Sequence, residues 1–239
     1  MINFLKFITK SLKEVFAPKI CVVCEKYFGD TVSYSEFICN KCYDSIPYCP
    51  SKDIIYNNLL MAIKLDDLFI SNASSLFQVD IHNHRWLEII HLLKYKGITK
   101  IGTEFGELLG KRIAKEGFAD YDYVIPVPIH QSKKRERGYN QSEFIAKSVA
   151  KILNCNYNSQ LLKRKKYTNS QTLLDTTERK KNIQNVFASY NDKAVELVNG
   201  KDILIVDDVL TTGSTINECA RILINMGANS VDVATLGHA

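Results

Sequence analysis

The sequence predicts an α/β fold: a parallel sheet flanked by helices, with a small cysteine-rich module at the amino-terminal end. Three observations support this prediction. Helical and strand patterns alternate over residues 81–239, which is typical of a parallel sheet. The segment 202–206 begins with Asp202 and continues as an unbroken apolar run, as a central strand should. Two Cys-x-x-Cys pairs lie within residues 1–50.

Bulk composition places the chain among ordinary globular proteins. Its 239 residues, 46% hydrophobic and 24% charged, suffice for one domain with a smaller appendage. The net charge of +5 suits anionic partners without selecting one. Residues 1–16 form an amphipathic pattern without the unbroken apolar core of a signal peptide, so we expect a helix that packs on the protein. We therefore expect a cytoplasmic protein with no stable membrane insertion.

The chain divides into three predicted regions. Residues 1–50 carry the first helix and the cysteine module, residues 51–80 form a transitional stretch of one or two strands and a short helix, and residues 81–239 form the sheet domain. The elements expected in the sheet domain are, in order, helices over 84–95 and 101–116, a strand over 123–128, a helix over 141–153, a mobile loop over 163–183, a strand over 202–206, a helix over 215–226 and a strand over 230–236.

The most specific motif follows the strand at 202–206. It reads Asp207-Asp208-Val209-Leu210-Thr211-Thr212-Gly213-Ser214-Thr215. A helix N-terminus offers unpaired N–H groups, Gly213 allows close approach of a ligand, and the hydroxyls can donate to phosphate. Two adjacent carboxylates suit a vicinal diol, directly or through Mg²⁺. This combination predicts a ribose 5-phosphate site; a plain strand-to-helix turn capped by Thr215 would explain only one hydroxyl.

This segment resembles the signature of the type I phosphoribosyltransferases, which bind 5-phosphoribosyl 1-pyrophosphate (PRPP). The resemblance implies that Asp207 and Asp208 contact the ribose hydroxyls, with Mg²⁺ bound alongside PRPP. It also implies that the following residues bind PRPP, with the 5-phosphate held by the last five: Val209, Thr211, Thr212, Gly213, Ser214 and Thr215.

A basic segment follows the strand at 123–128. Lys133, Lys134, Arg135 and Arg137 stand between this strand and the helix at 141–153. We interpret the segment as a basic loop at the carboxyl edge of the sheet, where a pyrophosphate group would bind. The alternative is a solvated run of charges.

The resemblance narrows further to the ComF family. It rests on the runs Leu92-Leu93-Lys94-Tyr95-Lys96-Gly97, Val127-Pro128 and Arg137-Gly138-Tyr139-Asn140-Gln141, and on the spacing of Gln171, Arg179, Asn182 and Phe187. That bacterial family joins a cysteine-rich module to a phosphoribosyltransferase-like domain and is tied to natural competence and DNA uptake. The resemblance implies single-stranded DNA and the competence machinery, including a helicase, as partners. It implies these pyrophosphate-side residues: Lys94, Arg135, Arg137 and Arg179. A transferase would use Asp207, Asp208 and Lys94 as its catalytic candidates.

The paired cysteines predict a metal site. Cys21, Cys24, Cys39 and Cys42 form two knuckles that together suit a closed tetrahedral structural Zn²⁺ site. Free thiols or a redox pair are the alternatives. ComF relatives often carry a further Cys-x-x-Cys near Cys49, which is absent here. We expect Cys49 to be a packing residue, and Cys155 and Cys219 to lie in helices and belong to the core. We expect three histidines to be surface or hydrogen-bonded polar residues: His82, His84 and His91.

Three functions stay open at this level. The first is a PRPP-binding ComF-type protein of DNA uptake, with or without Mg²⁺-dependent phosphoribosyl transfer. The second is a phosphoribosyltransferase of nucleobase salvage. The third is a non-catalytic adaptor that binds single-stranded nucleic acid through the cysteine module and the basic runs at 133–137 and 163–166. No residue identifies the acceptor substrate.

Overall fold

A computed structural model describes residues 18–29, 32–79, 85–118, 120–166 and 186–239. Several predictions fall outside these ranges and receive no structural account. They concern the helix in residues 1–16, most of the loop at 163–183, His82, His84, Gln171, Arg179 and Asn182.

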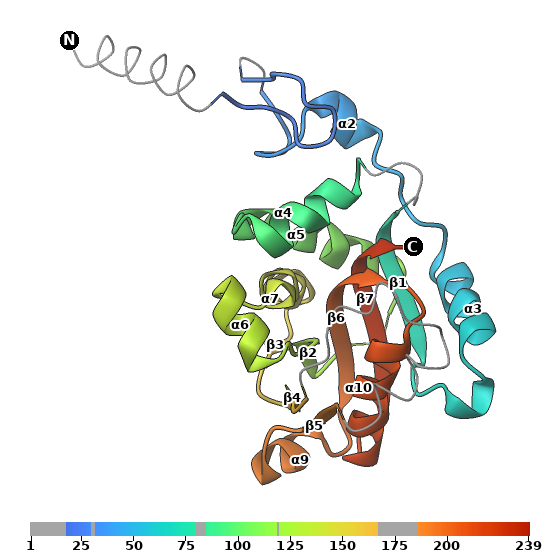
Figure 1. Ribbon diagram of the computed structural model, residues 1–239. Coiled ribbons are helices and arrows are strands. Elements are labelled where there is room, and N and C mark those ends of the chain that lie inside the picture. The colour runs from blue at the N-terminus through green and yellow to red at the C-terminus, as the bar shows by residue number, and fades with distance from the viewer. Residues whose placement is uncertain (1–17, 30–31, 80–84, 119, 167–185) are drawn as a thin grey trace.

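The core of the protein is a five-stranded sheet in the order β1-β7-β6-β2-β3, and every neighbouring pair in it is parallel (Figure 1). The strands are β1 (Asn72–Gln78), β2 (Tyr123–Pro126), β3 (Asn156–Tyr157), β6 (Asp202–Leu210) and β7 (Ser230–His238). β6 lies at the centre with apolar residues buried on both faces, as its unbroken apolar run predicts. The predicted fold class is confirmed.

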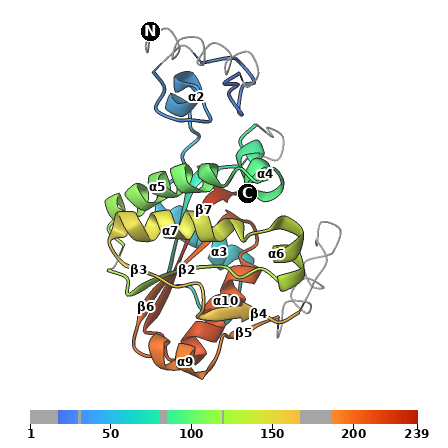
Figure 2. The same cartoon turned by 90° about the vertical axis from the view of Figure 1, so that its left-hand side faces the viewer.

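Helices cover both faces of the sheet (Figures 1 and 2). One layer contains α4 (Leu87–Tyr95), α5 (Thr99–Lys115) and α7 (Gln141–Leu153), and the other contains α3 (Lys52–Ala62) and α10 (Ser214–Asn225). Leu204 and Val206 of β6 belong to the first core, whereas Ile203 and Ile205 belong to the second. This alternation follows from the two-residue period of a strand.

Helices α5 and α7 pack closely because α5 presents glycines to its neighbour. A Cβ atom added at Gly106 would lie 2.8 Å from the carbonyl oxygen of Ile145, and one added at Gly110 would lie 2.8 Å from Cβ of Ile152. Larger residues at these positions would push the two helices apart. The glycines therefore fix the position of α7, whose first turn reaches the carboxyl edge of the sheet.

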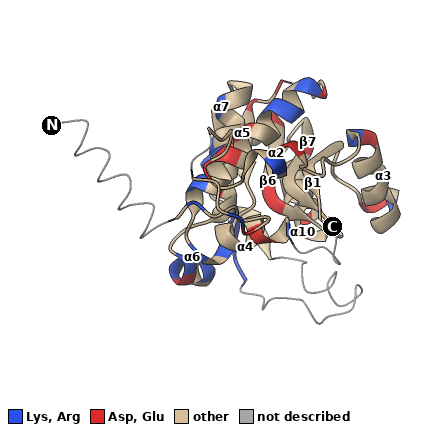
Figure 3. Cartoon of the chain, turned by 90° about the horizontal axis from the view of Figure 1, so that it is seen from above, with Lys and Arg blue, Asp and Glu red and all other residues tan. Residues whose placement is uncertain are grey.

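Two segments differ from the sequence-based prediction. The basic run at 133–137 is not a loop but part of a short helix, α6 (Gln131–Arg137), which ends at Gly138 with φ of 82°. Lysines and arginines concentrate on it (Figure 3). The start of the predicted loop at 163–183 is instead a strand, β4 (Leu162–Arg164), which pairs antiparallel with β5 (Phe187–Ser189). Helix α9 (Asp192–Val198) follows.

The amino-terminal module stands beyond one end of the helix layer (Figures 1 and 2). It contains an isolated bridge between Ile20 and Tyr27 and a short helix, α2 (Asn40–Asp44). The backbone N–H of Glu36 donates to Oε2 of Glu104 on α5, 3.0 Å away. Apolar residues of the module belong to the same hydrophobic core as buried residues of α4 and α5. Residues 51–80 supply α3, a 3₁₀ turn, η1 (Leu65–Asp67), and β1. Among the described residues, no helix has the length and apolar character needed to cross a membrane.

Candidate functional site

The site lies at the carboxyl edge of the sheet, where β2 ends at Pro126 while the neighbouring strand β6 continues to Leu210. After β6 the chain continues to β7 on one side of this pair, and after β2 it continues to β3 on the other side. A crevice therefore opens between β6 and β2 at this edge of the sheet. The N–H of Val127, just after β2, still donates to the carbonyl of Val206 at 2.9 Å. Asp207 and Asp208 come directly after that carbonyl, so the topology places both carboxyl groups at the crevice.

Asp208 is held by two side chains from different helices. Its Oδ1 lies 2.9 Å from Nζ of Lys94, the next-to-last residue of α4, and its Oδ2 accepts a hydrogen bond of 2.8 Å from Nε2 of Gln141. The Asp208 side chain is 5% exposed, whereas that of Lys94 is 26% exposed. Burial lowers the pKa of Lys94, but the adjacent charge and hydrogen bond of Asp208 outweigh it and leave that pKa raised. Lys94 is therefore a cation fixed against the acidic pair.

Asp207 lies in a different environment. Its Oδ1 accepts hydrogen bonds from Oγ of Ser142 at 2.7 Å and from the backbone N–H of Asp208 at 2.9 Å. Burial, followed by the charge of Asp208, raises the pKa of Asp207 to about 7, although Ser142 and Lys94 act in the opposite direction. One carboxyl group of the pair thus changes its charge near neutral pH.

The raised pKa of Asp207 predicts a pH-dependent stability. Between an unfolded-state pKa near 4 and the folded value of about 7, the folded protein holds a proton that the unfolded chain has released. This contribution to stability is complete below pH about 4 and is lost as pH rises through about 7. Urea unfolding from pH 5 to pH 8 should show Asp207→Asn gaining stability relative to the wild type as pH rises. Parallel curves for the two proteins would contradict the assignment.

The hydroxyl-rich loop joins β6 to α10. Gly213 precedes the helix with φ of 72°, a conformation that favours glycine, and an added Cβ atom would displace the Leu59 side chain of α3. The hydroxyls of Thr212 and Ser214 lie 3.0 Å apart, and the first turn of α10 follows at once. The hydroxyl loop and the N-terminus of α10 are therefore adjacent, an arrangement that suits a phosphate group.

A cavity of about 490 Å³ joins the acidic pair and this loop to a group of basic residues. Its cationic lining consists of Lys94, Lys133, Arg137 and Arg164. Burial, followed by the charges of Arg164, Arg137 and Lys94, lowers the pKa of Lys133. Like charges are thus close enough to disfavour one another, which is the arrangement that a polyanion would stabilise.

Most of the predicted PRPP-site residues that the structure describes line this cavity, but one does not. All residues of the acidic pair and the hydroxyl loop line the cavity, as do Lys94 and Arg137. Arg135 is exposed and does not line it. Lys133, part of the predicted basic segment, lines the cavity as well, and three contributors had no predicted role in the site: Gln141, Ser142 and Arg164. Lys133 and Gln141 belong to motifs that are identified in the sequence, but only the fold shows that they lie near the acidic pair.

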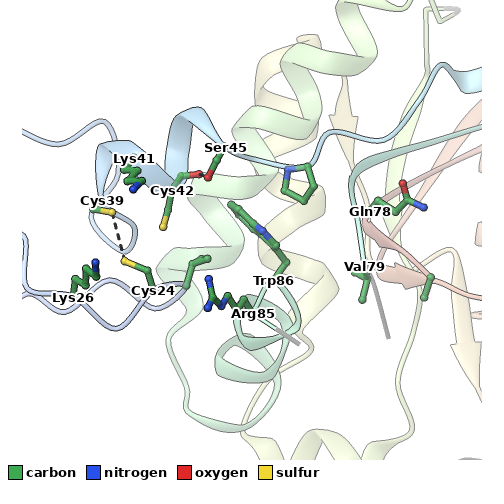
Figure 4. A pocket seen from close by; sticks show the side chains of 13 residues that line it. Cys24, Lys26, Cys39, Lys41, Cys42, Ser45, Gln78, Val79, Arg85 and Trp86 are labelled. Carbon is green, nitrogen blue, oxygen red and sulfur yellow. Dashed lines mark hydrogen bonds between the residues drawn. The ribbon is translucent and has the colours of Figure 1, made fainter. Parts of the chain in front are cut away.

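The four cysteines of the knuckles form a second candidate site. Their sulfur atoms all lie within 4.8 Å of one another, and the sulfurs of Cys24 and Cys39 are 3.8 Å apart (Figure 4). The first knuckle is closed by the N–H of Cys21 donating to the carbonyl of Lys26 at 2.9 Å, with Glu25 at φ of 59°. Four thiols at this separation can bind one metal ion such as zinc.

The remaining cysteines stay apart from that cluster. Cys49 is buried in the core around α3, and Cys219 is buried on α10. Cys155 lies just beyond α7 rather than within a helix, because the chain turns at Asn154 with φ of 54°. A groove of about 980 Å³ separates the cysteine cluster from the sheet and is lined by Trp86, Arg85 and Lys26, among others (Figure 4).

Comparison with known proteins agrees with this geometry. Residues 140–237 match the family model of the phosphoribosyl transferase domain. The chain is 34% identical over 150 residues to "DNA utilization protein YhgH" of Shigella flexneri, covering 61% of this chain and 63% of that protein. It is 32% identical over 116 residues to "Competence protein F" of Haemophilus influenzae, covering 48% and 50%, and 22% identical over 244 residues to "Competence protein ComFC" of Bacillus subtilis, covering 91% and 94%.

The sheet domain therefore resembles the phosphoribosyltransferase class over residues 140–237. The relatives, together with the cluster of four cysteines, confirm the resemblance to the ComF family. The chain spans less than two thirds of the length of the YhgH protein that it matches.

Proposed function

We propose that the protein binds PRPP in the cavity at the ends of β6 and β2. One observation carries the proposal: a carboxylate pair and a hydroxyl-rich helix N-terminus share one cavity with four cations. The loop at Thr211–Thr215 suits the 5-phosphate, and Asp207 with Asp208 suits the two ribose hydroxyls. Lys94, Lys133, Arg137 and Arg164 suit the pyrophosphate group, which a nucleoside monophosphate lacks.

The same residues support phosphoribosyl transfer as the chemistry of the site. In such a reaction a nitrogen nucleophile forms a bond to C1 of the ribose while the bond from C1 to pyrophosphate breaks. The basic side chains would stabilise the negative charge that develops on the leaving group, and the acidic pair would hold the ribose in place. Mg²⁺ bound with PRPP would supply further charge neutralisation, and the carboxylates at this edge suit it as ligands.

The relatives favour a role in the handling of DNA. Two are called competence proteins and one a DNA utilization protein, so we assign this chain to DNA uptake in a bacterial cytoplasm, with the competence machinery, including its helicase, as partner. We further propose that Cys21, Cys24, Cys39 and Cys42 hold a structural zinc ion. A phosphoribosyltransferase of nucleobase salvage is the alternative enzyme, and it requires turnover with one purine or pyrimidine.

One observation favours a nucleic-acid adaptor as the second candidate function. A further hollow of about 660 Å³ lies beside the PRPP cavity, and Arg164 lines both. Its lining includes Lys134, Lys163 and Lys165, which do not face the PRPP cavity. A phosphate backbone bound there would dissociate steeply with rising salt, because each neutralised phosphate releases a counterion.

Calorimetric titration with PRPP in the presence of Mg²⁺ tests the main proposal. We expect PRPP to bind at least tenfold more tightly than ribose 5-phosphate, because only PRPP reaches both the loop and the four cations. Equal affinity for the two compounds would contradict the pyrophosphate assignment. Pyrophosphate release, assayed over a panel of nucleobases and amines, then separates the hypotheses: steady release with one base establishes the salvage enzyme.

A further inference from the structure

Gln141 occupies a buried position between the acidic pair and the basic part of the cavity. It is the first residue of α7 and is 5% exposed. The preceding residue, Asn140, caps α7 by accepting from the N–H of Ser142 at 3.2 Å and donates from Nδ2 to the carbonyl of Val127 at 2.9 Å. The backbone of Gln141 is therefore anchored to the end of β2, at the crevice itself.

The amide of Gln141 joins two groups of opposite charge. Its Nε2 donates to Oδ2 of Asp208 at 2.8 Å, and its Oε1 accepts from Nη1 of Arg137 at 3.1 Å. An ionised carboxylate can only accept and a guanidinium can only donate, so a single orientation of the amide satisfies both. A rotation of this amide that improves one contact must disturb the other.

The rest of the run from Arg137 to Gln141 extends the same connection. Gly138 turns the chain between α6 and α7 with φ of 82°. The hydroxyl of Tyr139 donates to the carbonyl of Leu93 at 2.6 Å, directly beside Lys94, whose ammonium pairs with Asp208. These residues thus tie the proposed pyrophosphate side to the proposed ribose side through α4 as well as through the amide of Gln141.

Satisfaction of buried polar groups would explain one of these hydrogen bonds but not their arrangement. Arg137 and Asp208 both line the cavity, and Gln141 lines it between them. The centroid of the Tyr95 ring lies 5.1 Å from the guanidinium carbon of Arg137, a second contact that restricts this side chain. A ligand that draws Arg137 into the cavity therefore acts directly on the acceptor end of the amide.

We propose that Gln141 is a positioning residue that couples pyrophosphate binding at Arg137 to ribose binding at Asp208. The coupling rests on the proposed function, and it makes each half of PRPP bind more tightly when the other half is in place. An anion that fixes Arg137 fixes the amide, and the amide then holds Asp208 in one orientation toward the ribose hydroxyls. The strength of this coupling is the change in affinity for one half of PRPP when the other half is bound.

The test uses the two halves of PRPP as separate ligands of the full-length protein. Calorimetry with Mg²⁺ measures the affinity for inorganic pyrophosphate without and with saturating ribose 5-phosphate. For the wild type we expect ribose 5-phosphate to tighten pyrophosphate binding about fivefold or more. In Gln141→Met, which has similar length but no donor or acceptor, this ratio should fall to about one. The matched control Gln160→Met changes an exposed glutamine and should keep the wild-type ratio.

A second variant separates the two ends of the amide and carries the test if Gln141→Met does not fold. Gln141→Glu keeps an acceptor for Arg137 but places a carboxylate against Asp208, so ribose 5-phosphate should lose more affinity than pyrophosphate and the ratio should again approach one. A wild-type ratio preserved in either folded variant overturns the proposal, as does a wild type that binds both halves without mutual effect. A wild type that binds neither half overturns the PRPP proposal itself.

Discussion

Replacement of Asp207 and Asp208 together by asparagine is expected to abolish the rise in melting temperature that PRPP gives the protein. Both carboxyl groups belong to the part of β6 that extends beyond β2, and both line the cavity. Asparagine fills the same space without charge. An asparagine side chain is a weaker ligand for a cation than a carboxylate. It also has one acceptor oxygen instead of two, so it accepts fewer hydrogen bonds from the ribose hydroxyls. We expect PRPP affinity to fall at least a hundredfold, or about 2.7 kcal/mol. Differential scanning fluorimetry and calorimetry measure the two effects.

The chain offers a matched control for this double substitution. Asp66 and Asp67 form a second adjacent pair, which is exposed in η1. Asp66→Asn with Asp67→Asn makes the same change in formal net charge and should leave the effect of PRPP intact. Because the Asp207 and Asp208 substitutions also leave Lys94 without its carboxylate partner, the melting temperature without PRPP must be compared as well. Full PRPP stabilisation in a folded Asp207→Asn, Asp208→Asn protein would refute the site.

The acidic pair and the hydroxyl loop could be predicted from sequence because they are contiguous. Two carboxylates, a glycine and a helix start follow one another within the nine residues 207–215, so local geometry alone brings them close together. The two side chains that hold the carboxylates could not be predicted in this way. Gln141 and Ser142 are about 65 residues from the acidic pair along the chain, and they reach it only because α7 begins at the same edge of the sheet.

The basic segment shows how an error in local structure misplaces a side chain. When residues 133–137 are interpreted as a loop, Arg135 and Arg137 are equivalent candidates. In helix α6, Lys133 and Arg137 lie four residues apart and share a face, whereas Arg135 lies between them and faces away. The structure accordingly places Lys133 and Arg137 at the cavity and leaves Arg135 exposed. The helical signal was present in Gly138, a C-cap residue that ends α6.

Removal of the proposed zinc ion is expected to unfold the cysteine module while the sheet domain stays folded. The module has few buried apolar side chains of its own: Val23, Phe28, Ile38 and Ile46. Structural zinc contributes about 10–16 kcal/mol of apparent binding free energy in small zinc-finger peptides, which such a small core cannot replace. Elemental analysis should find about one zinc ion per chain. Addition of a strong chelator should then expose backbone amides at residues 21–42 to hydrogen exchange, while amides in β6 stay protected.

The single tryptophan of the chain gives an independent measurement of the same event. Trp86 is 7% exposed and lines the groove beside Cys24 and Cys42 (Figure 4). Unfolding of the module would uncover the buried Trp86 side chain, so its emission should shift to longer wavelength on chelation. Cys21→Ser with Cys42→Ser should show the shifted emission without chelator, because both residues are buried members of the cluster. Cys155→Ser, outside the cluster, should behave as the wild type. A metal-free protein with unshifted emission and protected amides would show that packing against α5 alone holds the module.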